Sequence, residues 1–249
     1  MSVKLGQFGE FVKEYEKARR PYPREVFTYL KRLLPNKNPK ILDLGCGTGI
    51  STRQLAGTGQ VIGCDPDPIM LKAARKHKRV NGERYVLGSA EKLPFKDNSF
   101  DAVTAFSAFH WFNNDESIGE IKRVLKTGGI IFLVNKAGWK NWGEGYRKAI
   151  IKSIGQEIAT FIQNTFKPKQ NLKRHKFKNI RSNDWERAEV VSSIKKALIY
   201  VQSISIWKTV PEDLRPKALS GLEEYFKKLK KRTGKIERKF KVRVVVGVK

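Results

Sequence analysis

Cysteine, histidine and long apolar runs are scarce in this chain of 249 residues. Its two cysteines, Cys46 and Cys64, fall at the ends of predicted strands and its three histidines are scattered, so no metal site is expected. No window holds the run of about 18 apolar residues that a membrane span requires. Residues 1–6 lack the apolar core of a secretory signal. These absences predict a cytoplasmic protein, in which a disulfide between the two cysteines is not expected.

Acidic side chains are also few. The chain has 24 Asp and Glu residues against 51 Lys and Arg residues, a formal net charge of +27. Residues 1–135 carry a net charge of +8, and residues 136–249 carry +19. Such a field attracts nucleic acid, anionic membrane surfaces and acidic metabolites. Lysine-rich helix faces that serve only solubility are the alternative explanation.

Three glycines in a G-x-G-x-G spacing, Gly45, Gly47 and Gly49, directly follow an apolar run at residues 41–44. Glycine lets the backbone turn sharply and lie close against a ligand, while the amides that open the next helix face that ligand. The dinucleotide fingerprint is G-x-G-x-x-G, so the third glycine comes one residue early here. The stretch predicts a nucleotide-binding turn that differs from that fingerprint.

An acidic residue, Asp65, ends the next apolar run at residues 61–64. A carboxylate at the tip of a neighbouring parallel strand can accept hydrogen bonds from both hydroxyls of a ribose. Alternatively, Asp65 caps the helix that begins near Asp67. The preceding glycines favour the ribose. Asp43 is expected to fix the glycine turn by hydrogen bonding rather than to contact a cofactor.

Strand-like and helical segments alternate along the first half of the chain. Strands are expected at residues 40–44, 60–64, 84–88, 100–105 and 129–134, and helices at residues 9–19, 24–34, 50–56, 68–79 and 115–125. This alternation is typical of a parallel sheet with helices on both faces. Ligands of such sheets bind outside the carboxyl ends of the strands. The candidate site therefore comprises residues 45–49, Asp65, 89–91 and 106–107.

The pattern changes after Asn135, where we expect the specificity of the protein to be determined. Expected elements are a helical insertion at residues 142–166, a loop and a sixth strand within 176–190, helices at 192–206 and 211–232, and a strand at 239–248. Four tryptophans lie in this half: Trp139, Trp142, Trp185 and Trp207. They either wall an apolar pocket or pack the insertion against the sheet.

Several short segments occur in a fixed order along most of the chain. They are Tyr15 with RPYP at 20–23, ILDLGCGTG at 41–49, VIGCD at 61–65, GSAEKLPF at 88–95, FDAV at 100–103, FHWF at 109–112 and RVLKTGG at 123–129. With these segments the chain resembles the class I S-adenosylmethionine-dependent methyltransferases. It is similar in particular to the small-molecule group that includes trans-aconitate and ubiquinone/menaquinone-type enzymes.

The resemblance implies a Rossmann-like α/β fold. Its seven-stranded, mainly parallel sheet would have helices on both faces, an antiparallel last strand at or near the edge, and a helical insertion after the fifth strand. It also implies three parts. Residues 1–35 would form an N-terminal helical lid, residues 36–135 the S-adenosylmethionine-binding core, and residues 136–249 an acceptor-binding insertion with the last strands of the same domain.

The resemblance also implies the cofactor site. The cofactor-binding residues would be Tyr15, Arg20, Tyr22, Gly45, Cys46, Gly47, Thr48, Asp65, Pro66, Ser89, Ala90, Glu91, Phe106 and Ser107. Asp65 would hold the ribose hydroxyls, and the loop at 89–91 would frame the adenine. Family members commonly carry Asp where this chain has Ser89, which weakens the expected contact with the adenine amino group. Arg20 would pair with the cofactor carboxylate; otherwise it is a surface charge.

Methyl transfer from a sulfonium is an in-line displacement, so alignment of the acceptor supplies much of the rate. A general base is needed only when the acceptor must lose a proton. His110 is the candidate base because it follows the fourth strand and histidine can titrate near neutrality. The resemblance favours a positioning role instead, because His-Trp recurs there in enzymes with different acceptors. The implied substrate-binding residues are His110, Trp111, Tyr200 and Ser203.

Three functions remain open from the sequence. The first is methyl transfer from S-adenosylmethionine to a small, acidic molecule, leaving S-adenosylhomocysteine. The second is methylation of RNA or another nucleic acid, which the basic second half and its interleaved aromatic residues favour. Against it, the chain lacks an Asn/Asp-Pro-Pro-aromatic motif after the fourth strand. The third is a non-catalytic protein that binds S-adenosylmethionine. The oligomeric state is not indicated.

Overall fold

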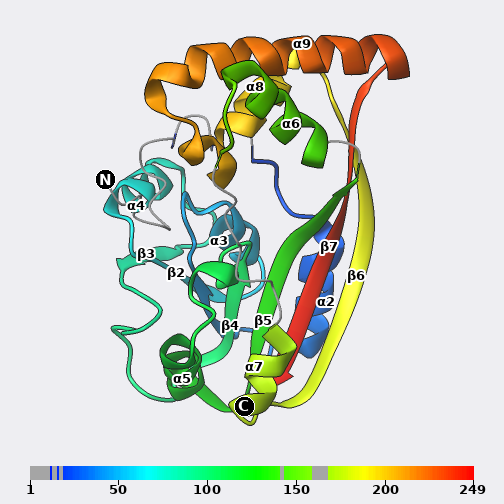
Figure 1. Ribbon diagram of the computed structural model, residues 1–249. Helices are drawn as coiled ribbons and strands as arrows, with labels where there is room; N and C mark the ends of the chain where they lie inside the picture. Colours follow the sequence, from blue (N-terminus) through cyan, green and yellow to red (C-terminus); the bar gives the residue numbers. More distant parts are fainter. Residues whose placement is uncertain (1–11, 13–15, 17–18, 141–142, 159–167) are drawn as a thin grey trace.

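A single mixed sheet forms the frame of the protein in a computed structural model that describes residues 12, 16, 19–140, 143–158 and 168–249 (Figure 1). The strands of the described chain are β1 (Lys40–Leu44), β2 (Gln60–Asp65), β3 (Arg84–Leu87), β4 (Phe100–Phe106), β5 (Leu125–Lys140), β6 (Lys178–Val191) and β7 (Ile236–Val248). They lie in the order β3-β2-β1-β4-β5-β7-β6. β1 to β5 are parallel, and β7 runs antiparallel to both β5 and β6. The predicted seven-stranded, mainly parallel sheet with an antiparallel last strand is confirmed.

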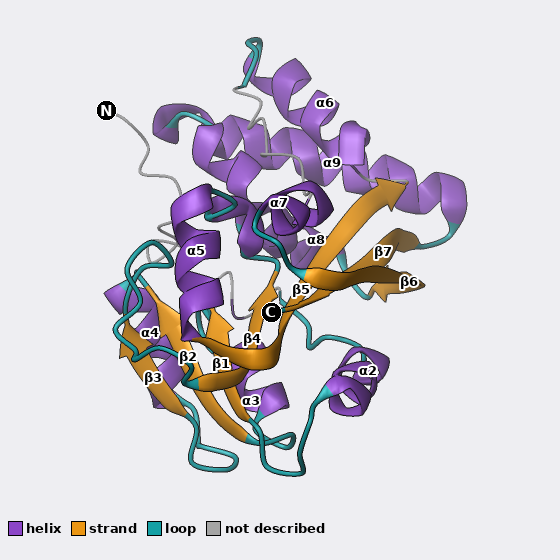
Figure 2. Cartoon of the chain, turned by 90° about the horizontal axis from the view of Figure 1, so that it is seen from below, coloured by secondary structure: helices purple, strands orange, loops and turns teal. Residues whose placement is uncertain are grey.

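Helices cover both faces of this sheet (Figure 2). The α-helices are α2 (Arg24–Leu33), α3 (Ile50–Leu55), α4 (Pro68–Lys76), α5 (Asp115–Val124), α6 (Gly143–Ile154), α7 (Pro168–Arg174), α8 (Ile194–Gln202) and α9 (Arg215–Thr233). Short 3-10 turns are η2 (Phe109–Trp111), η3 (Ser205–Thr209) and η4 (Glu212–Leu214). Most of the helix expected at residues 9–19 lies outside the described residues.

Strand periodicity divides the buried residues between the two faces. Because successive side chains of a strand point to opposite faces, every second residue of β5 faces the same side. Ile130, Phe132 and Val134 pack with α2 and α3, whereas Ile131 and Leu133 pack with α5 and α7. Both faces of β5 are therefore apolar, as a sheet covered by helices on both sides requires.

β5 and β6 are longer than the sequence predicts. The apolar pattern of β5 ends at Val134, yet β5 stays paired with β7 as far as Lys140 opposite Lys239. β6 is a continuous strand where a loop and a strand were expected, because β7 pairs with it from Arg181 to Val191. Ladder hydrogen bonds, rather than apolar side chains, extend these strands.

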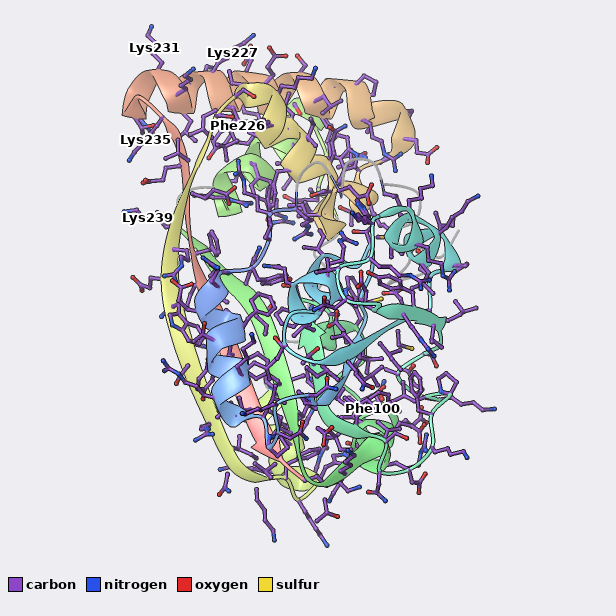
Figure 3. All side chains as sticks on the ribbon, turned by 180° about the vertical axis from the view of Figure 1, so that it is seen from behind. Phe100, Phe226, Lys227, Lys231, Lys235 and Lys239 are labelled. Atoms are coloured by element: carbon purple, nitrogen blue, oxygen red, sulfur yellow. The ribbon has the colours of Figure 1, made fainter. Side chains whose placement is uncertain are left out.

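A second hydrophobic core lies beyond the ends of these long strands. It is built by α6, α8 and α9 around Phe226, whereas Phe100 belongs to a core of the main sheet (Figure 3). α6 belongs to the helical insertion expected after the fifth strand, whereas α8 and α9 come after β6. The helix expected at residues 142–166 ends at Ile154, and residues 159–167 lie outside the described chain. No helix among the described residues is long and apolar enough to cross a membrane.

The helix expected at residues 192–206 is shorter than predicted. α8 ends at Gln202, and the chain continues as η3. The hydroxyl of Ser203 donates to the carbonyl of Tyr200 over 2.7 Å, and its amide also bonds back to the last turn. Side-chain bonding to the backbone at Ser203 therefore accompanies the end of the helix.

Candidate functional site

A pocket lies beside the carboxyl ends of β1 and β4, where the strand order of the sheet reverses. Such switch points are where open α/β sheets bind ligands. Six of the predicted cofactor-binding residues line this pocket: Arg20, Tyr22, Gly45, Cys46, Thr48 and Phe106. Arg19 and Lys136, which the sequence analysis did not single out, line it as well. The structure thus brings the N-terminal segment, the glycine turn and the end of β5 together.

The glycine turn needs glycine for both conformation and space. Gly45, Gly47 and Gly49 have φ values of +67°, +53° and +77°, which other residues rarely adopt. A Cβ atom on Gly45 would lie 2.5 Å from the Cβ atom of Ala108. The amide of Gly45 donates to the carbonyl of Cys64 over 2.8 Å, which ties the turn to β2. Both cysteines are free and buried.

Asp43 is fully buried beneath the turn. Its carboxylate accepts hydrogen bonds from the hydroxyls of Ser51 and Thr52, each at 2.7 Å, and of Thr104 at 3.0 Å. Burial raises the pKa of Asp43 to about 6, against the lowering effect of these bonds. Asp43 therefore joins β1, β4 and the first turn of α3, and it does not line the pocket described above. The expected structural role agrees with these contacts.

Asp65 lies at the end of β2 and is 7% exposed. One carboxylate oxygen accepts from the amide of Gly47 over 2.8 Å, and the other accepts from the amide of Asp67 over 2.9 Å. Burial raises the pKa of Asp65 to about 6, while these two amides oppose the rise. The cap of α4 is instead the side chain of Asp67, which accepts from the amides of Ile69 and Met70. Asp65 is therefore not the helix cap that was the alternative.

Thr48 presents a buried polar atom to the pocket. Its side chain is 1% exposed, and its hydroxyl has no hydrogen-bond partner among the described residues. Burying a hydroxyl without a partner costs free energy. A ligand in the pocket can supply that partner.

The loop after β3 lies at the same edge of the sheet. The amide of Gly88 donates to the carbonyl of Asp65, so the loop begins beside the end of β2. Ala90 is buried, whereas Glu91 is exposed and accepts from the side-chain amide of Asn114 over 3.2 Å. Ser89, Ala90, Glu91, Gly47 and the exposed Pro66 are not in the lining of the pocket described above.

Tyr22 is fixed over the end of β4. Its phenol donates to the hydroxyl of Ser107 over 3.0 Å, and its ring packs edge-on against Phe106 with centroids 4.8 Å apart. The side-chain amide of Gln54 on α3 bonds to both the backbone amide and the carbonyl of Tyr22. Ser107 itself has a φ of 53°, unusual for a residue with a side chain.

Arg20 has a protein partner in the structure. Its guanidinium pairs with the carboxylate of Glu189 on β6 at 2.5 Å and is 56% exposed. The predicted contact with a cofactor carboxylate would require this ion pair to loosen or to be shared. Tyr15 lies outside the described residues.

Comparisons with known proteins agree with this geometry. A family described as "Methyltransferase domain" matches residues 42–133, which include the glycine turn, Asp65 and His110. An uncharacterized methyltransferase of Mycobacterium tuberculosis is 39% identical over 153 residues, which make up 61% of this chain and 58% of the relative. A demethylmenaquinone methyltransferase of Corynebacterium kroppenstedtii is 44% identical over 101 residues, covering 40% of this chain and 42% of that protein.

The fold is found in a solved structure as well. The phosphoethanolamine N-methyltransferase 2 of Haemonchus contortus, in complex with phosphomonomethylethanolamine and S-adenosylhomocysteine, has a TM-score of 0.56 and 21% sequence identity. The match covers 97% of this chain and 57% of that one. The chain therefore has a match to a methyltransferase domain over residues 42–133 and shares its fold with a solved methyltransferase. It spans about 58% of the length of the first curated methyltransferases that it matches.

The residues of this site fit S-adenosylmethionine, the cofactor that the resemblance to class I methyltransferases implies. The unsatisfied hydroxyl of Thr48 offers a partner for a polar group in the pocket. Each carboxylate oxygen of Asp65 accepts one amide and keeps a further lone pair for a ribose hydroxyl. Gly45 has no side chain, so the turn packs closely against Ala108 and Phe112.

His110 lies in η2, just beyond β4. Burial, together with the positive charge of Arg19, lowers its pKa to about 4. A desolvated imidazole beside a cation resists protonation, so His110 is a weaker base than an ordinary histidine. Its ring is 4.7 Å from that of Trp111. The lowered pKa favours a positioning role, in which the neutral imidazole forms a hydrogen bond with the acceptor, over the role of general base.

Tyr200 and Ser203 occupy the end of α8 in the second core. Tyr200 is 6% exposed, and the guanidinium of Arg238 lies 4.1 Å from the centre of its ring. Ser203 is 2% exposed; its hydroxyl bonds to Tyr200, and its carbonyl accepts from Arg19 over 3.4 Å. The Ser203 hydroxyl thus already has a protein partner, which weakens its predicted role in substrate binding.

Among the residues that the sequence analysis missed, Lys136 carried a signal that was available. Lys136 is two residues beyond the predicted end of the fifth strand, at the sheet edge where ligands bind. Arg238 and Glu189 carried no such signal, because only the pairing of β6 with β7 brings them together. No group of three or more potential metal ligands occurs in the part of the chain that the structure describes.

Proposed function

We propose that this protein transfers the methyl group of S-adenosylmethionine to a small, acidic acceptor. The observation that carries the proposal is the shared pocket at the switch point, in which the glycine turn and Thr48 meet Tyr22, Phe106 and Lys136. The matched family and the similarity to quinone-type methyltransferases support it. The complex of the Haemonchus enzyme with a phosphorylated amine is an example of an anionic group on an acceptor in this fold.

In this proposal the three predicted parts have separate tasks. Residues 36–135 bind the cofactor, which supplies an electrophilic methyl group on a sulfonium. Residues 1–35 close over it, with Tyr22 held by Gln54 and Ser107 as the fixed point of the lid. Residues 136–249 place the acceptor opposite the methyl group. Because the reaction is a displacement, holding the acceptor in line and excluding water supply most of the acceleration.

The basic charge of the second half does not by itself favour nucleic acid. Four lysines lie at the end of the molecule formed by the second core (Figure 3): Lys227 and Lys231 on α9, Lys235 between α9 and β7, and Lys239 near the start of β7. Lys227 pairs with Glu223, and Lys235 pairs with Glu237. Lysines that are partly paired with nearby glutamates agree with the alternative explanation, in which this surface is exposed to solvent and serves solubility rather than nucleic-acid binding.

Calorimetry and a labelled-methyl assay test the proposal together. We expect S-adenosylmethionine and S-adenosylhomocysteine to bind one site, and label to enter acidic compounds of a small-metabolite extract. Transfer to RNA at physiological salt would replace the small acceptor by a nucleic acid. Binding without transfer to either pool would indicate a non-catalytic binding protein, and absence of binding would remove the proposed function altogether.

Replacement of His110 by alanine separates positioning from proton transfer. We expect turnover to fall about tenfold with an unchanged dissociation constant for S-adenosylhomocysteine, because a neutral His110 orients the acceptor. His77→Ala, at an exposed ion pair with Glu16, is the control. A general base contributes about 100-fold or more. A loss of that size, accompanied by disappearance of the acidic limb of the pH–rate profile, would contradict the positioning role.

A further inference from the structure

Three cationic side chains gather beside the pocket, where β5 and β7 leave the main core. This cationic cluster consists of Lys136, Arg238 and Arg19. Lys136 follows Val134 by two residues, so both side chains lie on the same face of β5. Lys136 pairs in register with Val242 of β7, and Arg238 lies four residues before Val242 on the same face. The strand pairing thus places Lys136 and Arg238 along one side of the sheet.

Lys136 is held between aromatic rings at the border of the pocket. Its ammonium group is 4.4 Å from the ring centre of Tyr22 and 5.8 Å from that of Phe240. Its hydrogen-bond acceptor is the carbonyl of Arg20, at the long distance of 3.5 Å. Within the described chain, Lys136 forms no ion pair with a carboxylate. A cation–π contact stabilises an ammonium group, but it supplies no negative charge.

In the part of the chain that the structure describes, Glu189 is the carboxylate that pairs with Arg238 and Arg20. Glu189 pairs with Arg238 through one oxygen and with Arg20 through the other. Arg238 is 3% exposed and stacks on Tyr200. Arg19 donates to the carbonyl of Ser203 and lies 5.8 Å from the same tyrosine ring. Among the described residues, Arg19, Lys136 and Arg238 thus lie around Tyr22 and Tyr200, and their positive charges outnumber the one carboxylate there, Glu189, which also pairs with Arg20.

The cofactor would not neutralise this charge. S-adenosylmethionine carries a sulfonium, an ammonium and one carboxylate, so it adds a net positive charge to the site. Buried cations without counter-charge are costly, and the cost falls when a ligand brings the opposite charge. The acceptor is the component of the reaction that can bring it.

We propose that the cationic cluster, through Lys136 above all, binds an anionic group of the methyl acceptor. The acceptor is then a small molecule bearing a carboxylate or a phosphate, with Tyr22 and Tyr200 as apolar walls beside that group. This inference rests on the proposed function, and it names the substrate class and the residue that selects it. Lys136 belongs to the same pocket as Gly45 and Thr48, so an anion bound to it lies next to the cofactor turn.

The lowered pKa of Lys136 agrees with a site that binds an anion. Burial, with the charges of Arg19 and Arg238, lowers the pKa of Lys136 to about 7, against the raising effect of Glu189. An anion beside the ammonium group would raise this pKa, so the protein takes up protons on binding between pH 7 and 8. Affinity for the anion should fall as pH rises above 7. The ionisable groups around Lys136 are those of Arg19, Arg20, Tyr22, Glu189, Tyr200 and Arg238.

Titration of small anions into the full chain saturated with S-adenosylhomocysteine tests the proposal. The probes are sulfate, for a phosphate-like group, and tricarballylate, for carboxylates; both are fully charged above pH 7. We expect Lys136→Met to weaken binding of at least one probe about tenfold or more, since hydrogen bonds between charged partners are the strong ones. Lys136→Arg should retain affinity within about threefold. Lys227→Met, which removes a lysine of the outer surface, should leave it unchanged.

A comparison of the affinities for the anion probes and for S-adenosylhomocysteine shows whether Lys136 binds the acceptor anion or the cofactor. Lys136→Met should leave the affinity for S-adenosylhomocysteine within about threefold of wild type; an equal loss of both affinities would mean that Lys136 holds the cofactor carboxylate. Failure of both probes to bind, or equal weakening by Lys136→Met and Lys227→Met, would overturn the proposal. If S-adenosylhomocysteine does not bind, the proposed function fails. In that case, the same anion titrations performed in the absence of S-adenosylhomocysteine test anion binding by the cationic cluster independently of the proposed function.

Discussion

Replacement of Asp65 by alanine is expected to weaken S-adenosylhomocysteine binding at least about 100-fold. Two effects combine. The ribose hydroxyls lose a charged acceptor, and each such hydrogen bond contributes about 1.5–3 kcal/mol. The amides of Gly47 and Asp67 lose the carboxylate that holds them, so the glycine turn is less well prepared for the ligand. Calorimetry with the cofactor product measures the loss.

Two further variants sharpen this prediction. Asp65→Asn keeps one acceptor oxygen and the shape of the side chain, so we expect a smaller loss, about tenfold. Asp213→Ala removes an exposed carboxylate from η4 and should change nothing. An unchanged dissociation constant for a folded Asp65→Ala protein would refute the assigned role.

The pH dependence of binding provides an independent check on Asp65. Its pKa in the free protein is raised to about 6 by burial, and ribose hydroxyls donate to the charged form. Affinity for S-adenosylhomocysteine should therefore be constant above pH 7 and fall as pH drops through 6, by up to about tenfold per pH unit for one proton. Asp65→Asn should remove this slope. Persistence of the slope would assign it to another group, such as Asp43, whose pKa is also raised to about 6.

Replacement of Gly45 by alanine is the second change with a large expected effect. Alanine at φ +67° is strained by about 1–2 kcal/mol. Its Cβ atom would also lie 2.5 Å from Ala108 and 3.3 Å from Phe112, and such overpacking costs about 1–3 kcal/mol. We expect the free energy of unfolding to fall by about 2–4 kcal/mol, together with weaker cofactor binding. Urea titration followed by circular dichroism measures the first effect.

A matched control and a double variant test the cause. Gly119 lies in α5 with open space around its Cα atom, so Gly119→Ala should stabilise the protein by about 0.5–1 kcal/mol through helix propensity. In the Gly45→Ala background, Ala108→Gly removes the Cβ atom that clashes with the new side chain. We therefore expect it to recover the part of the unfolding free energy lost to the clash, but not the part lost to backbone strain. Equal stability of Gly45→Ala and wild type would show that the turn relaxes and tolerates a side chain.

The elements predicted well from the sequence are those whose ends carry local signals. Asp67 followed by Pro68 marks the start of α4, and the glycine turn marks the end of β1, because caps and tight turns depend on neighbouring residues only. The end of β5 carries no such signal. Beyond Val134 the apolar pattern stops, and the strand continues because β7 supplies its hydrogen bonds.

The sequence by itself predicted the mainly parallel α/β fold. It also singled out the glycine turn and Asp65 as residues of the candidate cofactor site, because both belong to short local patterns. The tertiary structure decided the surroundings of those residues. Burial beside Arg19, not the identity of the residue, removes His110 from the neutral titration range. Register between β5, β7 and β6 brings Lys136, Arg238 and Glu189 to one face. Burial and strand pairing bring together residues about a hundred positions apart in the sequence. A local sequence pattern cannot predict such contacts, because they depend on which strands pair and in which register.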